Sequence, residues 1–185
     1  MITPTAIDPD LDWKEHYARY GFVVREKLLE PEFIETGLNE LKRLLDTDLP
    51  PQEWTEEMLE SAFNPKTIGS ASGPNAQING KQSPVLSNVY QQPRLRAAID
   101  ELFGRPGRFN PDDRQFQIFI NLQRAGAKPQ LTPRGHIDFV KKAIPVLGRG
   151  FMFQTSLIDK EPFGGNITIW SGTHRIVQKL SLIHI

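Results

Sequence analysis

The spacing of hydrophobic residues changes once along this chain, from helical periodicity in the first part to alternation in the last. Residues 31–46 place apolar side chains three and four positions apart, which predicts an amphipathic helix. Pro31 and the acids beside it suit the first turn of that helix. Shorter helices are expected at 13–20 and 93–103. The apolar stripe of the long helix consists of Phe33, Ile34, Leu38, Leu41, Leu44 and Leu45.

Alternating apolar and polar residues begin at Arg114 and predict β-structure. The clearest run is 116–122, and further strands are expected at 151–158 and 167–170, with a brief one at 21–24. Residues 64–87 are rich in Gly, Pro, Ser and Asn and predict a long loop. Helices first and strands later indicate an α+β fold, with helices packed outside an antiparallel sheet or barrel.

Length and composition limit which partners and how many domains are expected. A chain of 185 residues fits one domain, expected over 13–185 after a flexible arm at 1–12, with helices in 13–103 and a β core in 114–179. Its 22 basic and 22 acidic residues give no electrostatic reason to expect nucleic acid as a partner. The absence of Cys means that redox chemistry does not fix the compartment, so a cytoplasmic location is the default expectation. No apolar run is long enough to span a bilayer and the N-terminus does not resemble a signal peptide, so no membrane partner is expected.

The sequence His136-Ile137-Asp138 carries the strongest chemical signal. On an extended segment, the His and the Asp project to the same side because side chains alternate, so an imidazole and a carboxylate can share a metal ion. His174 would complete a set of two imidazoles and one carboxylate, which suits non-heme iron(II) and leaves coordination positions open.

Each candidate also has a plain structural interpretation. A His-x-Asp pair is common, so His136 could be a buried or loop histidine with Asp138 bonded to a nearby amide, and His174 could simply occupy a bend. His16, on the first predicted helix, is interpreted as structural rather than as a ligand. Lys81 and Arg134 are interpreted as solvated surface charges.

Three segments together resemble the phytanoyl-CoA dioxygenase family. Residues 164–175 contain a Gly-rich turn, a short apolar run and then Gly172-Thr173-His174, which is similar to the turn, strand and bend before the second His of that family. Residues 20–32 resemble the family's usual opening, and residues 116–121 resemble the strand before its His-x-Asp motif. The similarity is loose outside the three ligand positions.

The resemblance implies a fold, a cofactor and an activity. It implies a double-stranded β-helix core of the jelly-roll, cupin-like kind, with iron(II) held by His136, Asp138 and His174. It also implies 2-oxoglutarate as cosubstrate and O2 as oxidant, with Gln154 on a strand that faces the cosubstrate pocket. The expected reaction is hydroxylation of a small molecule, coupled to decarboxylation of 2-oxoglutarate to succinate.

The C-terminal end departs from the family pattern. The family holds the distal carboxylate of 2-oxoglutarate with a basic residue beyond the second His, at a place that falls on Ile185 here. The final strand of the fold is also missing, and residues 180–185 look out of register with what should follow. We therefore expect a C-terminally truncated fragment, with weak 2-oxoglutarate binding and an exposed sheet edge.

The sequence leaves two other functional classes open. The first is a catalytically silent β-barrel fragment that binds a metal or small ligand without oxygenase chemistry. The second is a cupin-like isomerase or hydrolase, which is less favoured because such sites use more His or Glu ligands than this chain offers. The sequence names neither the substrate nor the oligomeric state.

Overall fold

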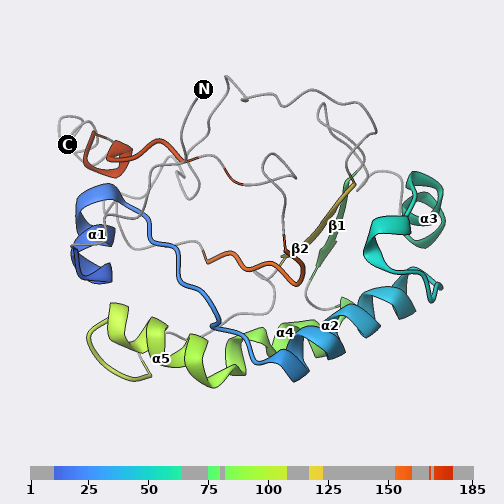
Figure 1. Ribbon diagram of the computed structural model, residues 1–185, viewed down its shortest axis with the longest axis horizontal. Coiled ribbons are helices and arrows are strands. Elements are labelled where there is room, and N and C mark those ends of the chain that lie inside the picture. Colours follow the sequence, from blue (N-terminus) through green and yellow to red (C-terminus); the bar gives the residue numbers. More distant parts are fainter. Residues whose placement is uncertain are drawn as a thin grey trace, which may run out of the picture. The chain divides into compact units, whose positions relative to one another are not determined.

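Figure 1 shows the computed structural model of the chain as a ribbon. The chain divides into two compact units. The first unit is Met1–Glu26 with Leu131–Thr155 and Ile167–Ile185, and the second is Lys27–Gln130 with Ser156–Asn166. Within these units the structure describes residues 11–63, 75–79, 82–107, 117–122, 153–159, 167 and 169–176.

Helices dominate the described residues. In chain order the elements are α1 (Trp13–Tyr20), α2 (Pro31–Leu44), η1 (Pro51–Glu53), α3 (Glu56–Ala62), β1 (Asn75–Asn79), α4 (Pro84–Ser87), η4 (Asn88–Gln91), α5 (Pro93–Leu102) and β2 (Gln117–Asn121). The predicted helices at 13–20, 31–46 and 93–103 are confirmed as α1, α2 and α5. None of the helices in these ranges is long and apolar enough to cross a bilayer.

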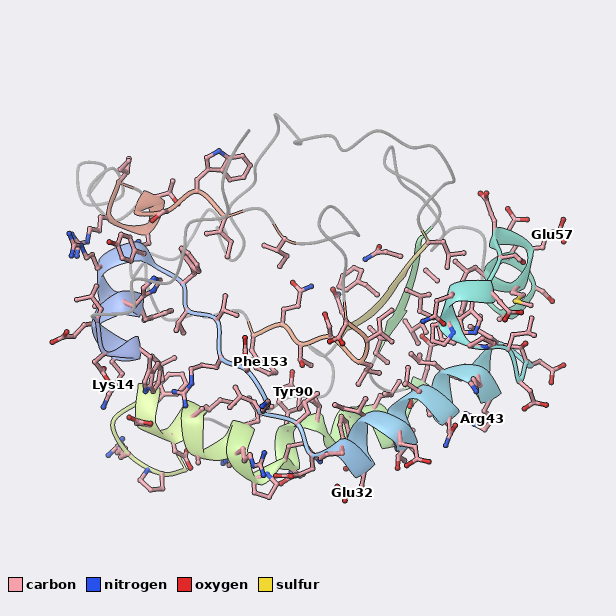
Figure 2. The ribbon with its side chains drawn as sticks, viewed as in Figure 1. Lys14, Glu32, Arg43, Glu57, Tyr90 and Phe153 are labelled. Atoms are coloured by element: carbon pink, nitrogen blue, oxygen red, sulfur yellow. The ribbon has the colours of Figure 1, made fainter. Side chains whose placement is uncertain are left out.

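Helix α2 forms where its sequence predicts because both ends carry favourable residues. Pro31 stands at the first helical position after an extended Glu30. Lys42 and Arg43 lie in the last turn, beside the negative end of the helix dipole. Glu32, in the first turn, and Arg43 both project from α2, and both are exposed (Figure 2).

The core of the second unit lies between α2, α3 and one face of a small sheet. Strands β1 and β2 pair antiparallel, with Ala76 opposite Ile120 and Ile78 opposite Ile118. Side chains two apart share a face, so this register buries Ala76, Ile78 and Ile120 together. Phe119 lies on the other face and is 55% exposed. The buried cluster comprises Leu41, Leu45, Leu59, Phe63, Ala76, Ile78, Leu86 and Ile120.

The predicted double-stranded β-helix is wrong. The described residues are mostly helical, and their strands form one two-stranded sheet. The strand predicted at 116–122 is confirmed as β2, but those at 21–24 and 151–158 are not strands where the structure describes them. The described residues of 167–170 are not strand either. Residues 159 and 171–176 are described and are not strand, and the rest of the predicted β core at 114–179 lies outside the described residues.

Two differences between the predicted and the observed elements have an identifiable physical reason. Leu157 packs against the core cluster, beside Gly37 of α2, so its apolar side chain covers helices instead of belonging to a strand. The loop predicted at 64–87 contains β1, because Ala76 and Ile78 meet a partner strand far along the sequence. Alternation is a local pattern, and it does not reveal whether a partner strand exists.

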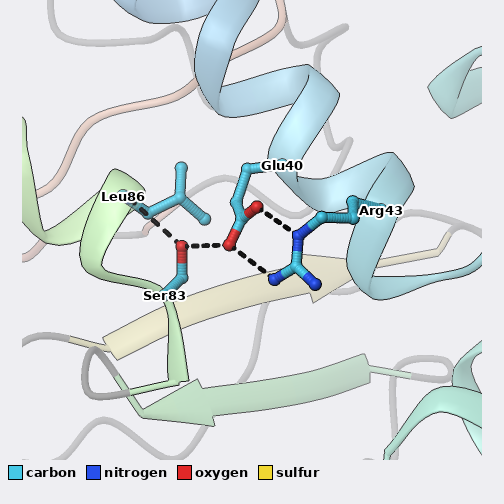
Figure 3. Close-up of polar contacts among 4 residues, drawn as sticks. All are labelled: Glu40, Arg43, Ser83 and Leu86. Atoms are coloured by element: carbon cyan, nitrogen blue, oxygen red, sulfur yellow. Dashed lines mark hydrogen bonds and ion pairs between the residues drawn. The ribbon is translucent and has the colours of Figure 1, made fainter.

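A buried polar network ties α2 to the start of α4 (Figure 3). The hydroxyl of Ser83 donates to Glu40 at 2.9 Å and accepts from the backbone N–H of Leu86 at 3.2 Å, so Ser83 also caps α4. Arg43 donates to both carboxylate oxygens of Glu40, at 2.7 and 3.0 Å. Hydrogen bonds from Arg43 lower the pKa of Glu40 most, burial opposes them, and the bond from Ser83 lowers it further.

Replacing Ser83 should lower the free energy of unfolding more than removing an ordinary helix cap does. Thr55 caps α3 in the same way, from an exposed position, and offers a matched control. We expect Thr55→Ala to lower the free energy of unfolding by about 1 kcal/mol. Ser83→Ala should lower it by about 2–3 kcal/mol, because it also leaves Glu40 without a buried donor. Equal losses in urea unfolding would show that the Ser83–Glu40 bond adds nothing.

Lowering the pH should destabilise the second unit because it protonates Glu40. Because the pKa of Glu40 is lowered in the folded chain, its contribution to stability is fully present above the ordinary pKa of a glutamate and is lost as pH falls through the folded value. We expect Glu40→Gln to destabilise the chain at neutral pH, and the difference from the unsubstituted chain to shrink on acidification. A difference that stays constant across that range of pH would contradict this assignment.

Candidate functional site

Of the three predicted metal ligands, the structure describes His174. His136 and Asp138 lie outside the described residues, as do Lys81 and Arg134. Gln154 lies on an exposed stretch without regular secondary structure. Among the residues that the structure describes, no cluster of three His, Cys, Asp or Glu side chains could hold a metal ion.

A tight turn carries His174. The hydroxyl and the backbone N–H of Thr173 both donate to the carbonyl of Trp170, at 2.7 and 3.2 Å, and the N–H of Arg175 donates to the carbonyl of Gly172 at 3.1 Å. Gly172 has φ +80°, a conformation that glycine adopts without steric cost. A single helical turn follows at 173–176. The small residues identified in the sequence thus build a bend that presents the imidazole.

The turn at 170–175 docks on the C-terminal end of α1, within the first unit. The N–H of Gly172 donates to the carbonyl of Tyr20 at 2.9 Å. The carbonyl of Ala18 accepts from Nε2 of His174 at 3.2 Å and from Nη2 of Arg175 at 3.1 Å. The last carbonyls of a helix have no partner inside the helix, and these three donors satisfy two of them.

Helix α1 ends at Gly21, and the conformation of this glycine makes room for the imidazole. Gly21 has φ +82°, and its N–H closes the last turn on the carbonyl of Tyr17 at 2.8 Å. A Cβ at position 21 would clash with Nδ1 of His174 and lie 2.8 Å from its Cγ. The ring therefore rests directly against the glycine backbone.

The tautomer of His174 follows from its hydrogen bond. A carbonyl oxygen only accepts, so Nε2 must carry the proton that it shares with Ala18. In the neutral imidazole the lone pair is then on Nδ1, to which no described residue is hydrogen-bonded. Metal-binding histidines typically hold their other ring N–H on a carbonyl or carboxylate in this way. The donor chemistry of His174 thus fits a metal ion.

His16 has an unpaired nitrogen that sequence reasoning missed. The side chain is fully buried between the rings of Tyr20 and Phe22, whose centroids lie 4.6 and 5.3 Å from its own. Its Nδ1 is 3.0 Å from the carbonyl of Phe22, while Nε2 has no partner among the described residues. Trp13, His16, Tyr17 and Tyr20 recur at helical spacing, a pattern that places His16 on the inner face of α1.

The second unit has a surface groove. Its volume is about 390 Å³, and its wall combines carboxylates of Glu30 and Glu32 with apolar side chains such as Phe33 and Pro93. Glu30 is paired with Arg94 at 3.2 Å. Of the predicted site residues that the structure describes, neither His174 nor Gln154 lines this groove.

Comparison with models of protein families, with curated proteins and with solved structures found no match for this chain. The resemblance to the phytanoyl-CoA dioxygenase family therefore rests on the motifs described above.

Proposed function

We propose that this chain is an iron(II)- and 2-oxoglutarate-dependent dioxygenase that hydroxylates a small molecule, with the metal held by His136, Asp138 and His174. The proposal depends on the types and spacing of these ligands and not on a double-stranded β-helix. Two imidazoles and one carboxylate are a set that favours iron(II) and leaves positions for a 2-oxo acid and oxygen.

One observation from the structure supports it most. The two sequence segments that resemble the family near its opening and at its second His, around Tyr20–Gly21 and Gly172–His174, are in contact although about 150 residues separate them. Their contact leaves His174 with a protonated Nε2 on a backbone carbonyl and a lone pair on Nδ1. This arrangement is the one that metal-binding histidines typically have.

The proposed roles of the residues follow from their chemistry. His136, Asp138 and His174 would bind the ion, whose bound form, with 2-oxoglutarate and O2, supplies the oxidising chemistry and yields succinate and CO2. The carbonyl of Ala18 holds the proton on His174, and the turn at 170–175 fixes the direction of the ring. Gln154 is proposed to contact the cosubstrate.

The test is iron-dependent formation of succinate from 2-oxoglutarate at millimolar cosubstrate. We expect His136→Ala to reduce turnover by more than the roughly 10–100-fold that loss of an outer partner of a metal ligand costs. His184→Ala removes a histidine without an assigned role and should leave turnover unchanged.

Two outcomes would contradict the proposal. One is succinate formation that survives His136→Ala at the level of the unsubstituted chain. The other is the absence of iron-dependent succinate formation from the unsubstituted chain itself, which would favour ligand binding without oxygenase chemistry.

A further inference from the structure

The C-terminal end of α1 does more than terminate a helix. Its carbonyls at Ala18 and Tyr20 receive three donors from residues 172–175, and its capping glycine receives a ring. These contacts join segments that are 156 residues apart in sequence, as the bond between His174 and Ala18 shows. A contact between such distant segments must offset a larger loss of chain entropy than a local turn does.

The direction of the hydrogen bond selects one of two neutral forms of His174. If Nδ1 carried the proton, Nε2 and the carbonyl of Ala18 would both be acceptors facing each other at 3.2 Å, which is repulsive. Arg175 donates to the same carbonyl at 3.1 Å and fixes its place beside the ring. The helix end therefore determines which nitrogen of His174 is free to act as a ligand.

Gly21 makes this arrangement possible in two ways. Its φ of +82° is in the left-handed region, where other residues are strained. Its missing Cβ leaves the space that Nδ1 and Cγ of His174 approach. Gly104 has a similar φ of +73°, but a Cβ there would meet no atom of the described residues within 4 Å. Both glycines adopt a positive φ, but of the two it is Gly21 that contacts the His174 ring.

We propose that the end of α1 is a positioning element for the metal site, in which the Ala18 carbonyl and Gly21 hold His174 as the tautomer that offers Nδ1 to the ion. This inference rests on the proposed function for the identity of the ligand, but its statement about the tautomer holds for the chain without metal. Gly21 and Ala18 would act through His174 and are not proposed as ligands.

The tautomer is measured first, by nitrogen-15 NMR of the histidine rings in the metal-free chain near neutral pH, with His174→Gln used to assign the signal. We expect the His174 ring to show an unprotonated Nδ1 and a protonated Nε2. Addition of Co²⁺ should perturb the Nδ1 resonance more strongly than that of Nε2. A protonated Nδ1 in the metal-free chain would overturn the inference, whether or not the chain is a dioxygenase.

Paired glycine variants then test the positioning role. We expect Gly21→Ala to weaken Co²⁺ binding by about 10–100-fold, the usual effect of losing an outer partner of a metal ligand. Gly104→Ala carries the same backbone strain without the clash and should bind Co²⁺ like the unsubstituted chain. Circular dichroism of both variants establishes that the helices are retained.

The outcomes separate the inference from the proposed function. Equal Co²⁺ affinity in Gly21→Ala and Gly104→Ala would overturn the positioning role even if succinate formation is observed. A tautomer as expected, in a chain that fails to bind Co²⁺, would overturn both the metal site and its positioning by α1. Tight Co²⁺ binding by the unsubstituted chain that is weakened in Gly21→Ala and kept in Gly104→Ala supports the inference.

Discussion

The burial of one face of β1 and β2 under α2 and α3 is the constraint on which the second unit depends. A two-stranded sheet is marginal by itself in water, because it cannot shield its own backbone and apolar face. Here Ala76 and Ile78 are fully buried and Ile120 nearly so, and they meet Leu59 of α3, which is also fully buried. The opposite face, with Phe119 largely exposed, contributes little. The helices and the sheet thus stabilise each other, and neither is expected to persist alone.

The first unit depends on a different constraint, which is the need of a helix end for hydrogen-bond donors. α1 is only eight residues long, too short to be stable without partners. Asp12 caps its beginning, and the turn at 170–175 satisfies its end. Since the same turn carries His174, the stability of α1 and the orientation of the proposed ligand are linked. The proposed chemistry at His174 therefore depends on how the short helix α1 ends.

The helices could be predicted from the sequence because helical periodicity and Pro at the first turn are local signals, as α2 and α5 show. The strands could be predicted only in part. Gln117–Asn121 has the alternation and also a partner, whereas Ile167 and Ile169 have the alternation and are half exposed. Pairing is decided by residues far away in sequence, so the pattern alone overestimated the number of strands among the described residues. The two-stranded sheet follows from a partner, Asn75–Asn79, that lies within a stretch predicted as a loop.

At the candidate site, the sequence singled out His174 but did not reveal what surrounds it. His174 was recognised from the small residues before it, and these residues do build the turn that carries it. That its imidazole would rest on Gly21 and donate to Ala18 could not be predicted, because no pattern links positions so far apart. The unpaired nitrogen of His16 was missed for the same reason. Helical spacing places the residue on the inner face but does not show what it meets there.

The central claim is that His136, Asp138 and His174 bind one iron(II) ion. X-ray absorption spectroscopy of the iron(II)-loaded chain, compared with His174→Ala, tests it most directly. The account predicts an iron environment of nitrogen and oxygen donors with the scattering signature of two imidazoles, reduced to one in the variant. A spectrum that is unchanged by His174→Ala would show that this histidine is not a ligand and would contradict the account.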